Sequence, residues 1–263
     1  MEGIFSGISS QDYHAMDGYV SNSYLSRLDR CPAAARVEQT ETAAMTFGAA
    51  LHCLLLEGDE AFMREFIVPP KLDLRTNAGK QMAADIRAAG LTLITEPDFE
   101  CMKGIVISVM THPVAGVMMK EGKSEQSVFW TDPETGLPCK CRPDRIPDGD
   151  KGVVVDIKTT KDAGYQAFAN SVIRYHYHTQ AAFYLNGYNA ASGKEADAFI
   201  FIACEREEPY RVEVYAMSPD FVDYGRVEVR RLLMIEKACR EGGFYPAYTT
   251  SDIRELYIPG WVR

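Results

Sequence analysis

The chain has 263 residues, of which 46% are hydrophobic and 25% are charged, an ordinary composition for a folded domain. A single domain covering residues 1–263 can bury a core of adequate size. No apolar run approaches the length of a membrane span, and residues 1–5 lack the pattern of a signal peptide, so we expect a cytoplasmic protein without a membrane partner.

The charge balance argues against a protein that coats nucleic acid, because phosphate contacts need Lys and Arg. The formal net charge is −9 and the sequence pI is about 5.1. A nuclease stays compatible, since metal-binding carboxylates add negative charge and the bound ions then reverse the local field. Seven scattered cysteines predict reduced thiols, and Cys139 and Cys141 lack the second Cys or His pair that zinc would need.

Residues 1–120 are predicted to be mainly helical. We expect a loosely structured arm over residues 1–20, and then a helix that is capped by Ser21 or Ser23 and ends before Pro32. A long helix is predicted from Thr42 to about Phe66, with an interruption allowed at Gly58. Two further helices are predicted over residues 78–89 and 97–110.

Residues 121–241 are predicted to form a sheet core, followed by a tail over residues 242–263. The sheet begins at residues 125–130 and continues with strands over 137–146 and 152–160, which a turn at 147–150 joins into a hairpin. The remaining predicted elements are helices over 165–171, 175–190 and 219–241, and strands over 196–205 and 210–217.

The strand over 152–160 carries the strongest chemical signal. It begins with an apolar run typical of a buried strand, and side chains two residues apart point to the same face. Asp156 and Lys158 therefore project together, away from Val155 and Ile157, and two buried charges are costly unless they are used. Asp144 on the neighbouring strand adds a second carboxylate. The group suits a divalent cation with an ammonium beside it, which can activate water against a phosphodiester.

Pro143-Asp144 followed by Asp156-Ile157-Lys158 is the signature of the PD-(D/E)xK nuclease superfamily, and further stretches resemble its RecE branch, also called exodeoxyribonuclease VIII. These stretches follow the family's order from about Tyr13 to near the end of the chain. They are Phe47–Cys53, Arg75–Lys80, Trp130–Gly136, Cys139–Asp144, Asp156–Thr160 and Arg174–Tyr188. The resemblance implies an α/β fold with a restriction-endonuclease-like core, in which helices flank a central mixed β-sheet, plus an N-terminal helical region.

The resemblance also implies an activity. It is the digestion of linear double-stranded DNA from 5′ ends, dependent on two Mg²⁺ ions that Mn²⁺ can replace. The resulting 3′ single-stranded tails would go to an annealing protein of the RecT type in phage-like recombination, and the enzyme would be a homo-oligomeric ring. Two alternatives stay open: another nuclease activity on the same fold (an endonuclease or a single-strand exonuclease), and a non-catalytic scaffold that binds DNA or a partner.

By the same resemblance, Asp144, Asp156, His52 and the main-chain carbonyl of Ile157 bind the metal ions. Lys158 would orient or deprotonate the attacking water. Glu125 would line the site, and Gln180 would orient it or touch DNA. Gly48 is expected to let its helix pass close to the sheet.

Contacts with DNA are expected at the start of the helix that ends before Pro32, in the loop near residue 75 and beside the catalytic hairpin. The residues are Ser23, Arg75, Lys80, Arg142, Gln180 and Tyr184. Gln180 and Tyr184 are four apart and so share one helix face. Plainer roles remain open: Ser23 as a helix cap, Arg75 and Lys80 as solvated charges, and Tyr184 as a core residue.

Overall fold

The computed structural model describes residues 1–40, 42–70, 72–148, 152–248, 253 and 255–258, and its main sheet is mixed. β8 (Gly152–Thr160) lies at the centre, parallel to β9 (Ala196–Glu205) on one side and antiparallel to β7 (Arg145–Ile146) on the other. β10 (Val212–Ala216) and β4 (Lys123–Ser124) form the edges. The predicted strands at 152–160 and 196–205 are confirmed. Half of the predicted turn at 147–150, residues 149 and 150, lies outside the described residues.

A second sheet contains β1 (Gly3–Phe5), β5 (Ser127–Thr131) and β6 (Pro138–Cys141), all antiparallel. The predicted single strand over 137–146 is therefore wrong. Its first half, β6, pairs with β5, and its second half, β7, pairs with β4 and β8. Pro143 lies at the break, where its missing N–H cannot support a strand ladder.

β4, β5, β6 and β7 follow one another along the chain as a long hairpin, with β4 and β5 in one arm and β6 and β7 in the other. Both arms cross from the main sheet to the second sheet. The chain passes from β4 to β5 through Glu125 and Gln126, and it returns from β6 to β7 through residues 142–144. The main-chain N–H of Glu125 donates to the carbonyl of Asp144, so the two crossings are bonded to each other. The crossings set the positions of Glu125, Arg142 and Asp144.

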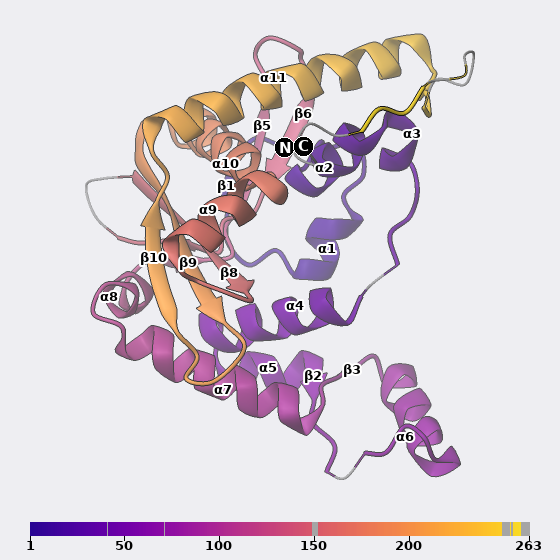
Figure 1. Cartoon of the computed structure of the whole chain (residues 1–263), viewed down its shortest axis with the longest axis vertical. Helices are drawn as coiled ribbons and strands as arrows, with labels where there is room; N and C mark the ends of the chain where they lie inside the picture. Colours follow the sequence, from indigo (N-terminus) through magenta and orange to yellow (C-terminus); the bar gives the residue numbers. More distant parts are fainter. Residues whose placement is uncertain (41, 71, 149–151, 249–252, 254, 259–263) are drawn as a thin grey trace.

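Helices cover the main sheet on both faces (Figure 1). On one face, Val155 and Ile157 pack with α4 (Ala43–Leu56), α5 (Asp59–Glu65), α7 (Glu96–Thr111) and α8 (Ala115–Lys120). On the other face, Val154 packs with α9 (Tyr165–Arg174), α10 (Tyr177–Ser192) and α11 (Pro219–Gly242). The predicted alternation along β8 is confirmed, as is the helix interruption at Gly58, which has a φ of 86°.

The N-terminal segment is ordered, so the expected loose arm is wrong. β1 pairs with β5, α1 (Ser10–Ala15) buries Tyr13, and Val20 bridges to Cys139. α2 (Asn22–Arg30) is confirmed, with Ser21 as its cap rather than Ser23, and the one-turn α3 (Pro32–Ala35) follows. Pro32 opens α3 because proline suits the first position of a helix.

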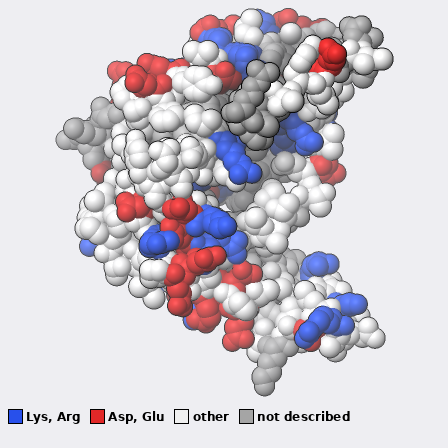
Figure 2. Space-filling model, viewed as in Figure 1, with Lys and Arg blue, Asp and Glu red and all other residues white. Residues whose placement is uncertain are grey.

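One part projects from the body: α6 (Asn77–Ala88), next to the two-stranded parallel sheet of β2 (Phe66–Ile67) and β3 (Thr92–Leu93) (Figure 1). Basic side chains mark this projection, and the surface is hollowed between it and the N-terminal helices (Figure 2). Within the described residues, no helix is both long and apolar enough to cross a membrane.

Candidate active site

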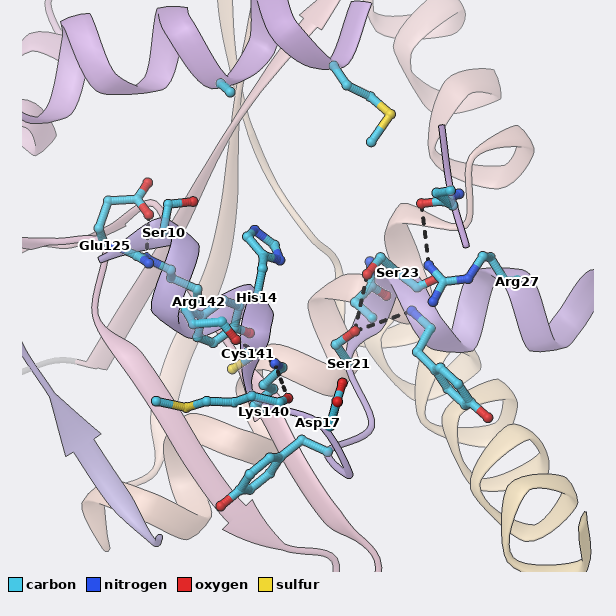
Figure 3. Close-up of a pocket in the computed structure, with 18 of the residues that line it drawn as sticks. Ser10, His14, Asp17, Ser21, Ser23, Arg27, Glu125, Lys140, Cys141 and Arg142 are labelled. Carbon is cyan, nitrogen blue, oxygen red and sulfur yellow. Dashed lines mark hydrogen bonds and ion pairs between the residues drawn. The ribbon is translucent and has the colours of Figure 1, made fainter. Parts of the chain in front are cut away.

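A cleft of about 1060 Å³ lies between the N-terminal helices and α4. One end is formed by the two sheet crossings and by His52 of α4, and the other by the start of α2. In Figure 3, Glu125 and Arg142 lie on one side of the pocket, while Ser21, Ser23 and Arg27 lie on the opposite side. The cleft therefore extends from the predicted metal site to the helix start at which a DNA contact was predicted.

Asp144 and His52 line the cleft, and the main chain of Ile157 contacts both of them. The main-chain N–H of Ile157 donates to Asp144 Oδ2 at 2.6 Å, and His52 Nδ1 lies 3.4 Å from Asp144 Oδ1. His52 Nε2 lies 3.2 Å from the carbonyl oxygen of Ile157. Three of the four predicted metal ligands thus contact one another, although His52 lies about a hundred positions before the other two in the sequence.

Glu125 completes a compact ligand group. Ligand atoms of His52, Glu125 and Asp144 all lie within 4.8 Å of one another. Glu125 has a φ of 51°, a left-handed conformation that a non-glycine residue adopts at a cost and that recurs at functional sites. Sequence reasoning placed Glu125 at the start of a strand. The structure places it at a crossing between sheets, and this conformation turns its carboxylate toward Asp144.

Asp156 lies beside this group and has partners of its own. Lys158 Nζ is 2.6 Å from Asp156 Oδ2, and Gln180 donates from Nε2 to Asp156 Oδ1 at 2.6 Å. Both Asp156 and Gln180 are buried. The Lys158 ammonium lies 5.0 Å from the centre of the Tyr177 ring. Gln180 is thus hydrogen-bonded to the Asp156 carboxylate; its role in orienting the site and its contact with DNA both stay predictions.

Burial and neighbouring charges shift the pKa values of the ionisable groups in the site. Although burial lowers the pKa of His52, Asp144 raises it to about 9. Burial raises the pKa of Asp144, but the charges of His52 and Lys158 outweigh burial and hold this pKa below its usual value. Burial, with the nearby charge of Asp144, raises the pKa of Glu125 to about 7. Burial likewise raises the pKa of Asp156 to about 6, against the effect of Lys158.

The donor set fits a divalent cation. Two carboxylates and an imidazole converge, and oxygen and nitrogen donors of this kind bind Mg²⁺ and Mn²⁺. The raised pKa values of Glu125 and Asp156 show that their charges lack full compensation inside the protein. A cation would supply that compensation. His52, Glu125 and Asp144 would hold it, with Asp156 and the Ile157 carbonyl adjacent.

The predicted DNA contacts divide into two sets. Ser23, Arg142 and Tyr184 line the cleft. Among the described residues that line the cleft, Arg75 and Lys80 are absent. Lys80 lies on α6, and Arg75 lies just before α6 and forms an ion pair with Asp73. An interaction of these two residues with DNA would need a substrate that reaches the projection.

Two other features differ from expectation or were missed. A Cβ atom added at Gly48 would meet nothing within 4 Å, so Gly48 does not serve a close approach to the sheet. Lys140 was missed: its buried ammonium donates to the carbonyls of Tyr13 and Met16 at 2.6 and 2.8 Å and so fastens α1 against β6. The only available signal was a lysine between two strand cysteines.

Comparison with known proteins agrees with this geometry. A sequence model of the family described as "PDDEXK-like domain of unknown function (DUF3799)" matches residues 21–253. The chain belongs to this PDDEXK-like family. The expectation of a PD-(D/E)xK nuclease domain is thereby confirmed, with Asp144, Asp156 and Lys158 in the motif positions.

One solved structure supports the fold of this PDDEXK-like chain. A "Putative exonuclease" from Eubacterium rectale is 15% identical, with a TM-score of 0.61 over 97% of this chain and 96% of that one. An alkaline exonuclease from Laribacter hongkongensis is 14% identical, with a TM-score of 0.34 over 89% of this chain and 97% of that one. The first likeness confirms the mixed α/β fold. No curated protein matches the chain.

Proposed function

We propose that this PDDEXK-like nuclease is a Mg²⁺-dependent exonuclease of the RecE type, which digests linear double-stranded DNA from 5′ ends. The observation that carries the proposal is the group of His52, Glu125 and Asp144 at one end of a cleft, with the Lys158–Asp156 pair next to this group. The other end of the same cleft contains the start of α2, and helix N-termini favour phosphate. A 5′-terminal phosphate beside Ser23 would place a nearby phosphodiester at the catalytic end.

The chemistry is the attack of water on phosphorus, with departure of the 3′ oxygen. A bound divalent ion would lower the pKa of the attacking water and neutralise charge that develops on the phosphate. Lys158 keeps its proton, because the charges of Asp156 and Asp144 raise its pKa despite burial. A protonated Lys158 can orient the water and shield a phosphate oxygen, which favours these roles over proton removal. Gln180 would help to hold Asp156 in position, because it donates a hydrogen bond to the carboxylate.

Two partner proposals accompany the activity and rest on the sequence resemblance. The enzyme would assemble as a homo-oligomeric ring around duplex DNA. The 3′ single-stranded tails that it leaves would pass to an annealing protein of the RecT type.

The test is the digestion of duplex DNA labelled at either the 5′ or the 3′ end, with Mg²⁺ or with EDTA. We expect early release of the 5′ label, only in Mg²⁺, and no cutting of a closed circular duplex. Asp156→Asn, which keeps the shape but removes a charge, should abolish cleavage while the protein stays folded. Cutting of the closed circle would indicate an endonuclease, and preference for single strands a single-strand exonuclease. Binding without any cleavage would indicate a scaffold.

A further inference from the structure

Two of the three guanidinium nitrogens of Arg142 are buried and make no hydrogen bond. Its side chain is 13% exposed, and its Nε and Nη1 atoms are buried without a hydrogen-bond partner. The contact of Nε with Glu125 Oε2 at 2.6 Å is an ion pair that lacks hydrogen-bond geometry. A buried guanidinium with unused donors is costly, and a phosphate can accept two parallel hydrogen bonds from it.

Glu125, the partner of Arg142, also belongs to the proposed metal group. The carboxylate that balances Arg142 lies within 4.8 Å of the ligand atoms of His52 and Asp144. A divalent ion at this group would draw on the negative charge of Glu125 and repel the guanidinium 2.6 Å away from that carboxylate. The ion and Arg142 thus compete for one carboxylate.

Arg142 lies where a released guanidinium would face the cleft. It lines the cleft together with Lys140 and Tyr13, and its guanidinium carbon is 5.6 Å from the centre of the Tyr13 ring. Figure 3 shows the side chain extending from the sheet crossing toward Glu125, next to His14. The Tyr13 ring is buried and supports the flat face of the guanidinium, so a short shift can exchange one acceptor for another.

We propose that Arg142 exchanges Glu125 for a phosphate of the DNA when a divalent ion binds at Glu125. The metal ion then prepares a DNA contact as well as the chemistry, and in its absence Glu125 keeps Arg142 from binding phosphate. The inference rests on the proposed function insofar as the ligand is a polynucleotide and the ion binds at this group.

The first test measures DNA affinity without catalysis. Binding of a fluorescent duplex is followed by anisotropy in EDTA and in Ca²⁺, with gel analysis to show that the duplex stays intact. Glu125→Gln frees Arg142 and should raise the affinity in EDTA about tenfold, the worth of a hydrogen-bonded charge contact. The rise should vanish when Arg142→Gln is added. Glu57→Gln removes the same charge from the same cleft without freeing Arg142, so its effect should be much smaller.

The second test measures metal binding without DNA. Removing the competitor should make Arg142→Gln bind Ca²⁺ several-fold more tightly by calorimetry, whereas Arg36→Gln, another cleft arginine, should change the affinity little. Arg142→Met also removes the charge and keeps the length of the side chain, and it replaces Arg142→Gln if that variant melts early.

Equal DNA affinity of Glu125→Gln and wild type in EDTA would overturn the exchange, as would a rise that survives Arg142→Gln. Either result would leave the nuclease assignment intact. A wild-type protein that binds no duplex in EDTA or in Ca²⁺ would instead overturn the proposed function, and the exchange with it.

Discussion

Lys158 is half-buried and lies next to one carboxylate and two aromatic rings, and it is not among the expected metal ligands. We predict that Lys158→Ala lowers the cleavage rate by about 10²- to 10³-fold, the usual loss for an electrostatic group at a transition state. Its Mn²⁺ affinity, measured by calorimetry, should change far less. The matched control is Lys161→Ala, an exposed lysine just beyond β8, which should cleave normally. A Lys158→Ala protein that loses Mn²⁺ but still cleaves at a normal rate would contradict the role of Lys158.

Metal binding should release protons. His52 has a pKa of about 9 in the metal-free protein and carries a proton at pH 7, while Glu125, with a pKa of about 7, is about half protonated. A ligand must lose its proton to bind, so affinity for Mg²⁺ should rise from pH 6 to about 9 and then level off. Calorimetry in two buffers of different ionisation enthalpy counts the protons. Metal binding to His52→Gln should release about one proton fewer than binding to the wild type. A binding enthalpy that is the same in both buffers would refute the assignment.

Asp144, Asp156 and Lys158 could be predicted from the sequence because strand alternation fixes which side chains share a face. Glu125 could be listed as a site residue, but its backbone conformation could not be predicted. Its carboxylate reaches Asp144 through a left-handed conformation at a crossing between sheets. Lys140 could not be found at all. Its function depends on carbonyls of α1 that lie more than a hundred residues earlier in the chain.

At the scale of elements, two helix glycines should respond in opposite ways to alanine. A Cβ at Gly48 of α4 meets nothing within 4 Å, whereas a Cβ at Gly225 of α11 would lie 2.1 Å from the carbonyl oxygen of His178. Gly48→Ala should therefore stabilise the protein by about 0.5–1 kcal/mol through helix propensity. Gly225→Ala should destabilise it by about 1–3 kcal/mol, because α10 and α11 must separate.

Denaturant unfolding of both variants against wild type measures these differences. A destabilised Gly48→Ala would mean that α4 packs more closely than the structure shows. An unchanged Gly225→Ala would mean that α10 and α11 can part at little cost.

The elements themselves were mostly predictable, because a long periodic stretch such as α11 buries one face. The pairing of strands was not. The hairpin that contains β4 to β7 is divided between two sheets, and the division depends on where each of its two arms bends. The local sequence indicates only one of these bends, at Pro143. β1 was missed for a related reason: its pairing partner β5 is distant in the chain.

At the scale of the whole molecule, an acidic chain should hold a polyanion poorly as an open monomer. With a net charge of −9, a closed ring would retain DNA by topology, with basic groups needed only along the passage. Exposed apolar side chains on α7, α8 and α11, such as Ile107, Val117 and Val227, could contribute to a repeated interface. We expect light scattering coupled to size-exclusion chromatography to show a discrete oligomer. A monomer at micromolar concentration that digests long duplexes processively would exclude the ring.

The pairing of β1 with β5 has a consequence for synthesis on the ribosome. β1 is synthesised before β5, so Gly3 can pair with Phe129 only after residue 129 has been made. In the same way, α1 can be bonded to Lys140 only after residue 140 has been made. At ordinary translation speeds this delay is on the order of ten seconds. Asp156 and Lys158 emerge later still, so a nascent chain or a prematurely ended fragment has no complete cleft. The proposed cleavage of DNA would therefore begin only after nearly the entire catalytic core has been made.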